Sequence, residues 1–184
     1  MKMKLCDLMR LQHTQRWTIV PTTRPQSVAE HSFNVALIAA RIARYSPVSF
    51  DLAVLGQAAL MHDAPEAVLG DIPTPTKSKM RDIGFEPSQL EFMIQGQMSK
   101  LPCHYEFVIK AADILDGIHF LANFGTGARA DAVLKQLTEA YDTMIVNAAH
   151  GLPESLKTDQ FTGNKFAVAL SVVREEVLSQ EWTE

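Results

Sequence analysis

Apolar residues recur at helical spacing along most of the chain, and no segment shows the alternation typical of a β-strand. The first strong pattern lies in residues 28–45, where four positions spaced by four, three and four residues share one helix face. These positions are His31, Val35, Ile38 and Ile42. Ser27 followed by Glu30 is typical of a capping box, which predicts a helix from Val28 to about Tyr45. We therefore expect His31 to point toward the core or toward a site cut into it.

A second helix is expected over residues 51–67, with Asp51 as its cap. The same spacing of four, three and four residues recurs within it, at Leu55, Ala59, His62 and Glu66. His62 and Glu66 should therefore share a face. Residues 70–77 contain two prolines, which remove amide donors and restrict the residues before them, so this stretch is expected to be an ordered loop.

Four further helices are expected from periodicity and from glycine or proline near the helix ends. They cover residues 87–100, 102–124, 128–149 and 161–180. The connections are short, and no internal repeat is visible. The sequence therefore predicts an all-α fold, a single domain over residues 1–184 built as a bundle of about six or seven helices.

Composition and charge narrow the function classes. The 184 residues are 47% hydrophobic and 21% charged, which is ordinary for a globular protein and excludes fibrous or disordered classes. The net charge of -4 gives no positive potential that would attract nucleic acid, so a general nucleic-acid-binding protein is not expected. A small phosphorylated substrate is still possible. Cys6 and Cys103 lack the spacing of a metal or disulfide motif, and no apolar stretch is long enough for a signal peptide or a membrane span. A cytoplasmic location is expected.

Two histidines and two aspartates from three expected helices carry the candidate chemistry: His31, His62, Asp63 and Asp113. Imidazole and carboxylate together suit a divalent transition metal and leave positions open for water and substrate. A single histidine on an apolar face is more often a hydrogen-bonded core residue, but an aspartate among Ala, Ile and Leu is costly to bury unless it is paired or metal-bound. Asp116 and His119, further along the same helix, are interpreted as a solvated or locally paired face.

The order of these residues resembles the H…HD…D signature of HD-domain metal-dependent phosphohydrolases. His62-Asp63-Ala64-Pro65-Glu66, followed by Gly70-Asp71-Ile72-Pro73-Thr74-Pro75-Thr76-Lys77, is closely similar to the subgroup of the bacterial 5′-deoxynucleotidase YfbR. Arg16-Trp17 ahead of Ser27-Val28-Ala29-Glu30-His31-Ser32 matches that subgroup too, and the resemblance covers about residues 5–120. Within the subgroup, the short segment between His62-Asp63 and Asp113, with Arg16-Trp17-Thr18-Ile19 before the first long helix, resembles phage dATP triphosphohydrolases.

The resemblance implies a role for each site residue. The metal ligands would be His31, His62, Asp63 and Asp113, and the ion Zn, Co or Mn. Glu66 would accept the proton of the attacking water, and Asp71 would orient that water or bind a second ion such as Mg. Arg16 and Lys77 would bind phosphate, with Lys79 and Lys110 as weaker candidates. Trp17 would pack on the deoxyribose and leave no room for a 2′-hydroxyl, and Ile19 would crowd C2 of adenine and reject a 2-amino group.

The function implied is hydrolysis of dATP to deoxyadenosine and triphosphate, with dADP and dAMP as further substrates. Such phage enzymes deplete dATP where 2-aminoadenine replaces adenine in DNA. The alternative is a 5′-deoxynucleotidase that releases phosphate from deoxynucleoside monophosphates. A noncatalytic nucleotide-binding bundle with a structural metal is a third possibility, which Glu66 and Asp71 beside the ligands argue against. Related enzymes also imply a homo-oligomer, either a dimer or a hexamer.

Overall fold

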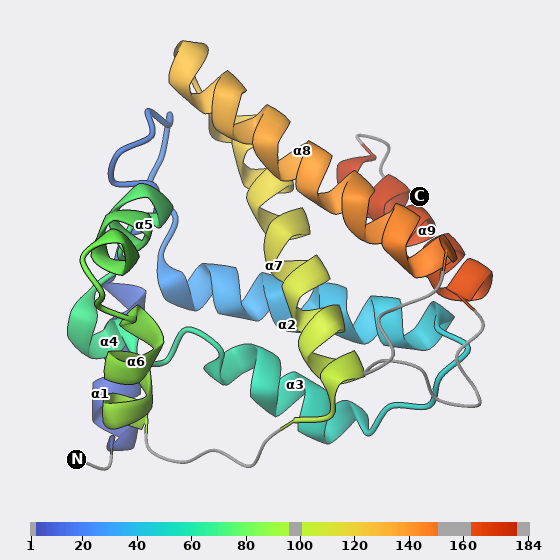
Figure 1. Cartoon of the computed structure of the whole chain (residues 1–184), viewed down its shortest axis with the longest axis horizontal. Coiled ribbons are helices and arrows are strands. Elements are labelled where there is room, and N and C mark those ends of the chain that lie inside the picture. Colours follow the sequence, from blue (N-terminus) through green and yellow to red (C-terminus); the bar gives the residue numbers. More distant parts are fainter. Residues whose placement is uncertain (1–2, 96–100, 151–162, 180–184) are drawn as a thin grey trace.

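The computed structural model describes residues 3–95, 101–150 and 163–179, and this part of the chain contains no β-strand. Within it, seven helices have nine or more residues and three helical segments have four (Figure 1). The elements are α1 (Leu5–Leu8), η1 (Met9–Gln12), α2 (Val28–Tyr45), α3 (Leu52–Met61), α4 (Glu66–Leu69), α5 (Thr74–Asp82), α6 (Pro87–Gln95), α7 (Cys103–Phe124), α8 (Gly127–His150) and α9 (Gly163–Leu178). The all-α prediction is confirmed.

A continuous apolar core joins α2, α3, α7, α8 and α9. In Figure 1, α7 crosses α2 near the middle of the molecule, and α8 and α9 lie beside it. One fully buried residue from each of these five helices illustrates the core: Val35, Leu55, Leu115, Tyr141 and Leu170. The Tyr141 hydroxyl donates a hydrogen bond to the carbonyl of Leu170 at 3.0 Å, so α8 and α9 are joined by a polar contact inside an apolar interface.

The two predicted N-caps are confirmed, but the Glu30 half of the capping box is not formed, because the Glu30 carboxylate accepts hydrogen bonds from Arg24 instead. The Ser27 hydroxyl accepts a hydrogen bond from the backbone N–H of Glu30 at 3.1 Å, and α2 begins at the next residue. The Asp51 carboxylate accepts from two backbone N–H groups in the first turn of α3. The predicted apolar stripe of α2 is buried along its whole length, including His31.

The predicted second helix is too long, because α3 ends at Met61 and only the short α4 follows. Pro65 has no N–H to donate to the carbonyl of Met61, so the helical ladder cannot continue. Instead, the N–H of Ala64 donates to that carbonyl at 3.1 Å and makes a tighter turn. His62 follows this helix end directly, and its Nδ1 lies 2.7 Å from the carbonyl oxygen of Ala59 in α3.

The predicted loop over residues 70–77 is wrong in its second half, because α5 begins at Thr74. Pro75 lies in the first turn of α5, where a missing N–H would have had no helical partner. Nothing in the sequence pattern predicted α1 and η1. The predicted bounds of α7 and α8 agree with the structure within one residue at each end, whereas the expected extension of α6 to residue 100 lies outside the described residues.

The corner between α7 and α8 depends on a glycine. A Cβ at Gly125 would lie 2.6 Å from the carbonyl oxygen of Leu121 and 3.1 Å from Cβ of Ala130, which is too close for any other residue. Among the described residues, no helix combines the length and apolar character that crossing a membrane requires.

Candidate active site

Folding brings the four predicted metal ligands together from α2, the turn after α3, and α7. His31 Nε2 lies 3.3 Å from Oδ1 of Asp113 and 3.5 Å from Oδ2 of Asp63. His62 Nε2 lies 3.2 Å from the same Asp63 oxygen, and the two imidazole rings are 5.2 Å apart. One donor atom each from His31, His62 and Asp113 falls within 4.8 Å of the others. The four side chains therefore form one cluster.

The hydrogen bonds of the two histidines leave the right atoms available for a metal ion. His31 Nδ1 lies 2.6 Å from Asp116, and His62 Nδ1 lies 2.7 Å from the carbonyl oxygen of Ala59. Because both partners are acceptors, each Nδ1 carries the proton and each Nε2 presents a lone pair. In the described part of the chain, both Nε2 atoms are buried without a hydrogen-bond partner. Such a donor set fits a divalent metal ion.

The charges in the cluster also fit a cation. Although burial opposes ionisation, the nearby histidines lower the pKa of Asp63, and His31, Lys110 and Arg16 lower the pKa of Asp113 well below its usual value. Burial likewise disfavours a charged His62, but the Asp63 carboxylate outweighs it and raises the pKa of His62. Both aspartates are therefore carboxylates at neutral pH and available as ligands.

Glu66 and Asp71 stand beside the cluster as a second pair of carboxyl groups. Glu66 is only 9% exposed, and its Oε2 is buried without a hydrogen-bond partner among the described residues. Burial, followed by the charges of Asp63 and Asp71, raises the pKa of Glu66 to about 8. Burial also raises the pKa of Asp71. A carboxyl group whose pKa lies near neutrality can exchange a proton at physiological pH.

Asp116 corrects one interpretation made from the sequence. It is only 1% exposed, not solvated, and its carboxylate accepts hydrogen bonds from His31, from Gln26 at 2.8 Å and from Asn34 at 2.8 Å. Burial opposes its ionisation, but these partners lower the pKa of Asp116. The signal was present in the sequence, because Asp116 follows Asp113 by three residues and is flanked by Leu115 and a glycine.

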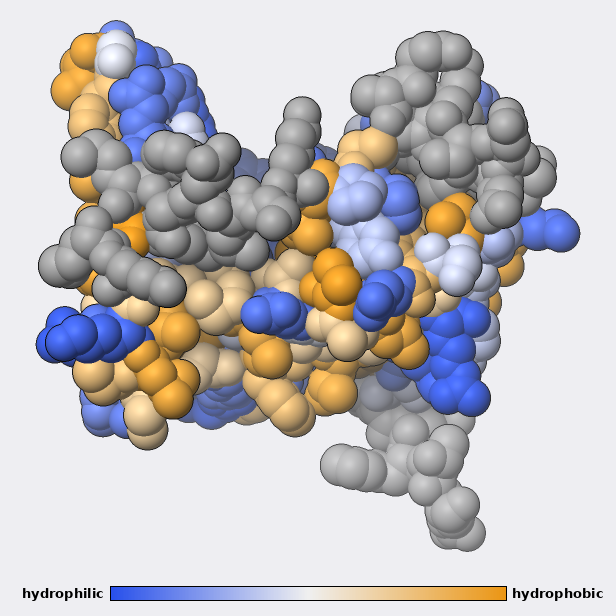
Figure 2. Space-filling model, turned by 90° about the horizontal axis from the view of Figure 1, so that it is seen from below, coloured by the Kyte–Doolittle hydropathy of each residue, from blue (hydrophilic) through white to orange (hydrophobic). Residues whose placement is uncertain are grey.

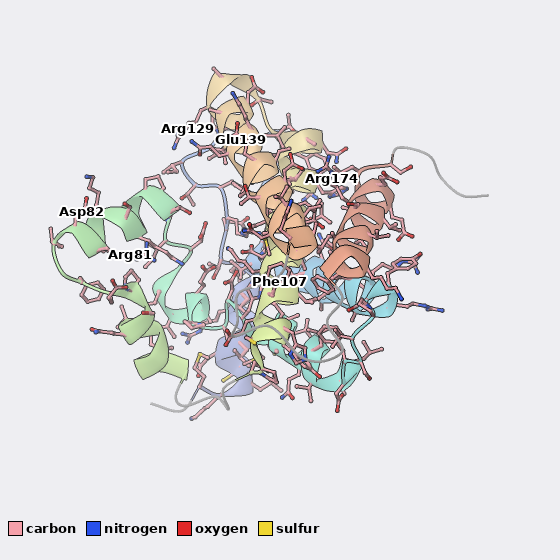
Figure 3. The ribbon with its side chains drawn as sticks, turned by 45° about the vertical axis from the view of Figure 1, so that its right-hand side comes forward. Arg81, Asp82, Phe107, Arg129, Glu139 and Arg174 are labelled. Carbon is pink, nitrogen blue, oxygen red and sulfur yellow. The ribbon has the colours of Figure 1, made fainter. Side chains whose placement is uncertain are left out.

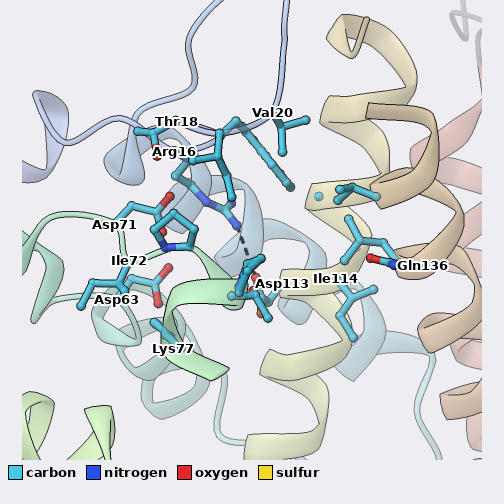
Figure 4. Close-up of a pocket in the computed structure, with 18 of the residues that line it drawn as sticks. Arg16, Thr18, Val20, Asp63, Asp71, Ile72, Lys77, Asp113, Ile114 and Gln136 are labelled. Atoms are coloured by element: carbon cyan, nitrogen blue, oxygen red, sulfur yellow. Dashed lines mark ion pairs between the residues drawn. The ribbon is translucent and has the colours of Figure 1, made fainter. Parts of the chain in front are cut away.

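A cavity of about 600 Å³ opens beside the cluster and is lined by Asp63, Glu66, Asp71 and Asp113 (Figure 4). All four predicted substrate-binding residues line it as well: Arg16, Trp17, Ile19 and Lys77. In Figure 4, Arg16 reaches across the cavity from the loop before α2, and its NH2 group lies 3.8 Å from Asp113. The structure thus places the predicted substrate residues and metal ligands around one space.

Several lining residues were not predicted as part of the site. Cationic side chains come from Arg81 of α5 and Arg129 of α8, which Figure 3 shows on separate parts of the fold. Lys110 of α7, one of the two weaker phosphate-binding candidates, also lines the cavity. The face of α8 that meets the cavity carries Val133, Gln136 and Leu137. Lys79, by contrast, is 84% exposed and pairs with Asp82 outside the cavity. Arg81 and Arg129 could not be assigned from spacing, because only the tertiary packing brings their helices to the cavity.

A helical bundle that presents two histidines and two aspartates beside a cation-lined cavity defines an HD-type metal-dependent phosphohydrolase. The sequence model of the family described as 5′-deoxynucleotidase YfbR-like matches residues 5–107, more than half of the chain. This protein belongs to that family of HD-domain hydrolases.

Individual relatives include two phage enzymes and a bacterial one. The dATP triphosphohydrolase of Salmonella phage PMBT28 is 34% identical over 144 residues, which are 73% of this chain and 74% of the relative. The dATP triphosphohydrolase of Acinetobacter phage SH-Ab 15497 is 28% identical over 172 residues, which are 83% of this chain and 84% of the relative. The 5′-deoxynucleotidase of Shewanella oneidensis is 33% identical over 95 residues, which are 50% of this chain and 49% of the relative.

A solved structure shares the fold. The cyanophage S-2L HD phosphohydrolase (DatZ), bound to dA and one catalytic Zn²⁺ ion, superimposes with a TM-score of 0.68. The match covers 96% of this chain and 99% of that chain at 23% identity.

Proposed function

We propose that this protein hydrolyses dATP to deoxyadenosine and triphosphate, with dADP and dAMP as further substrates. The observation that carries the proposal is the composition of the cavity. It joins the His-Asp cluster to five cationic side chains and to an apolar wall, so one space offers partners for a phosphate chain and for a nucleoside. The two phage relatives, both named dATP triphosphohydrolases, support dATP as the substrate.

In this proposal, His31, His62, Asp63 and Asp113 hold a Zn, Co or Mn ion, and Asp71 can hold a second ion such as Mg. The S-2L structure with its Zn²⁺ ion supports zinc as the first choice. A divalent ion held there would polarise a phosphoryl oxygen and lower the pKa of a water molecule.

The side chains around the cluster supply the proton transfers and the binding. Glu66 accepts a proton from the attacking water, whose oxygen forms a bond to the α-phosphorus while the bond from that phosphorus to the 5′-oxygen breaks. The acid form of Glu66 returns the proton to the departing 5′-oxygen, so deoxyadenosine and triphosphate leave complete. Asp71 orients the water, and Arg16 and Lys77 bind the phosphate chain.

Specificity in this proposal comes from the apolar end of the cavity. Trp17 forms the wall against the deoxyribose, and Ile19, half-exposed at the cavity, meets C2 of the base. A fixed wall rejects an added hydroxyl or amino group by steric clash. The selection for adenine would serve a phage that replaces adenine by 2-aminoadenine.

The second candidate is a 5′-deoxynucleotidase that acts on several deoxynucleoside monophosphates. The family description and the bacterial relatives favour it. Both candidates use the same cluster and differ in whether the cavity accepts the β- and γ-phosphates.

We further propose a single HD domain over residues 1–184 and a cytoplasmic homo-oligomer, either a dimer or a hexamer. The core shared by α2 and α9 supports one domain. Figure 2 shows apolar side chains gathered on the face seen from below, and Leu52, Val54 and Leu60 of α3 are each more than 40% exposed. An exposed apolar surface of this kind supports self-association.

The decisive experiment is to incubate the zinc-loaded protein with dATP, dGTP, dCTP, dTTP, ATP and dAMP separately and to resolve the products by chromatography. Deoxyadenosine and triphosphate from dATP, with little turnover of dGTP or ATP, are expected. Phosphate from several monophosphates, with the triphosphates untouched, would establish the second candidate instead. A Glu66→Ala variant should keep its metal and its fold but lose about 10²–10⁴ in kcat.

A further inference from the structure

Gln26 is a fully buried polar residue that lies between the metal cluster and the wall of the cavity. Its Oε1 accepts a hydrogen bond from the indole N–H of Trp17 at 2.7 Å, and its Nε2 donates to Asp116 at 2.8 Å. An indole N–H can only donate and a carboxylate can only accept, so the amide has one permitted orientation. Gln26 is therefore held at both ends.

Asp116 continues this connection to the metal ligands. The oxygen that accepts from Gln26 also lies 2.6 Å from Nδ1 of His31. This contact keeps the proton of His31 on Nδ1 and directs Nε2 toward Asp63 and Asp113. Gln26, Asp116 and His31 are all 1% exposed or less, so water does not compete for these hydrogen bonds.

Trp17, at the other end, has a backbone conformation that needs support. Its φ of 62° is the only positive value of a non-glycine residue in the described part of the chain. Such a conformation is unfavourable for a residue with a side chain and persists only where the surroundings impose it. The ring is stacked parallel to Phe120 at 6.0 Å, and a Cβ added at Gly117 would lie 3.5 Å from it, while its one N–H is bound by Gln26.

We propose that Gln26 is a positioning residue that couples the Trp17 wall to the metal ligand His31 through Asp116. The same buried amide then sets two properties of the site: the affinity for the metal ion and the discrimination against a 2′-hydroxyl. The inference rests on the proposed metal site and on Trp17 as the wall against the deoxyribose. It adds that the affinity for the metal ion and the position of Trp17 depend on each other.

Zinc affinity, measured on metal-free protein by competition with a chromophoric chelator, tests the coupling without any nucleotide. Gln26→Met keeps the side-chain length and loses both hydrogen bonds, so it should weaken zinc binding about tenfold or more. Gln26→Asn keeps the amide but cannot span both partners, so it should also weaken zinc binding. It serves as the test if the Met variant fails to fold. Trp17→Phe should weaken zinc by about two- to fivefold although Trp17 is not a ligand.

The double variant distinguishes coupling from independent damage. With Gln26→Met already present, adding Trp17→Phe should cause no further loss of zinc affinity, because the connection is already broken. Tyr141→Phe is the matched control, since it removes a buried hydrogen bond between α8 and α9 and should leave zinc affinity unchanged. In substrate assays, the ratio of kcat/KM for dATP over ATP should fall in both Gln26 variants.

Zinc affinity within twofold of wild type in folded Gln26 variants would overturn the proposal, as would an equal effect of Trp17→Phe in both backgrounds. Coupled zinc affinities in a protein that leaves dATP intact would refute the proposed substrate and support the coupling. A wild-type protein that binds no zinc would overturn both the metal site and the coupling.

Discussion

Glu66 allows a quantitative test of the electrostatics of the site. In the metal-free protein its pKa is about 8, against 4.5 for an ordinary glutamate, because burial and the neighbouring carboxylates disfavour its charged form. The unfolded chain releases this proton near pH 4.5, whereas the folded protein keeps it until about pH 8. The contribution of Glu66 to stability is therefore complete below pH 4.5 and is lost as the pH rises toward 8.

The expected size follows from this pKa difference. Each pKa unit corresponds to about 1.4 kcal/mol, so the wild-type protein should lose roughly 2–5 kcal/mol of unfolding free energy relative to Glu66→Gln between pH 4.5 and pH 8. Glutamine keeps the size of the side chain and cannot ionise, so the difference between the two proteins isolates this one proton.

Urea denaturation in the presence of EDTA, at intervals from pH 5 to pH 8.5, measures the difference. Glu175→Gln on the exposed face of α9 serves as the control and should follow the wild-type pH dependence. Adding zinc should reduce the wild-type loss, since a nearby cation favours the carboxylate form. Parallel stability profiles for wild type and Glu66→Gln would refute the reasoning, because they would show that Glu66 ionises equally in the folded and unfolded states.

Three further outcomes are expected. Asp63→Ala should lose both zinc and turnover, and normal metal content with full activity would contradict its assignment as a ligand. Ile19→Ala should raise the kcat/KM for dGTP relative to dATP, whereas an unchanged ratio would mean that another residue meets C2. Tyr141→Phe removes the hydrogen bond to the Leu170 carbonyl and should cost about 0.5–1.5 kcal/mol of unfolding free energy, measured by urea denaturation at pH 7. A smaller loss would show that this hydrogen bond contributes little to stability.

The sequence determined the helices whose signals are local. The Ser27 and Asp51 caps and the stripe from His31 to Ile42 depend on contacts within a few residues, and the structure agrees with them. Proline was harder to interpret, because its effect depends on its position in a helix. Pro65 ends the ladder after α3, whereas Pro75 fits the first turn of α5 without cost.

The metal ligands could be predicted from the sequence, whereas the buried hydrogen bond between Gln26 and Asp116 that lies behind them could not. His31, His62-Asp63 and Asp113 were found from residue type and order, because imidazole and carboxylate side chains are common ligands of divalent metal ions. The sequence around Asp116 carried a signal of burial, but its pairing with Gln26 was decided only by the tertiary structure, since the two residues are 90 positions apart. A buried hydrogen bond between distant residues depends on which helices pack together, and that information lies in the fold as a whole.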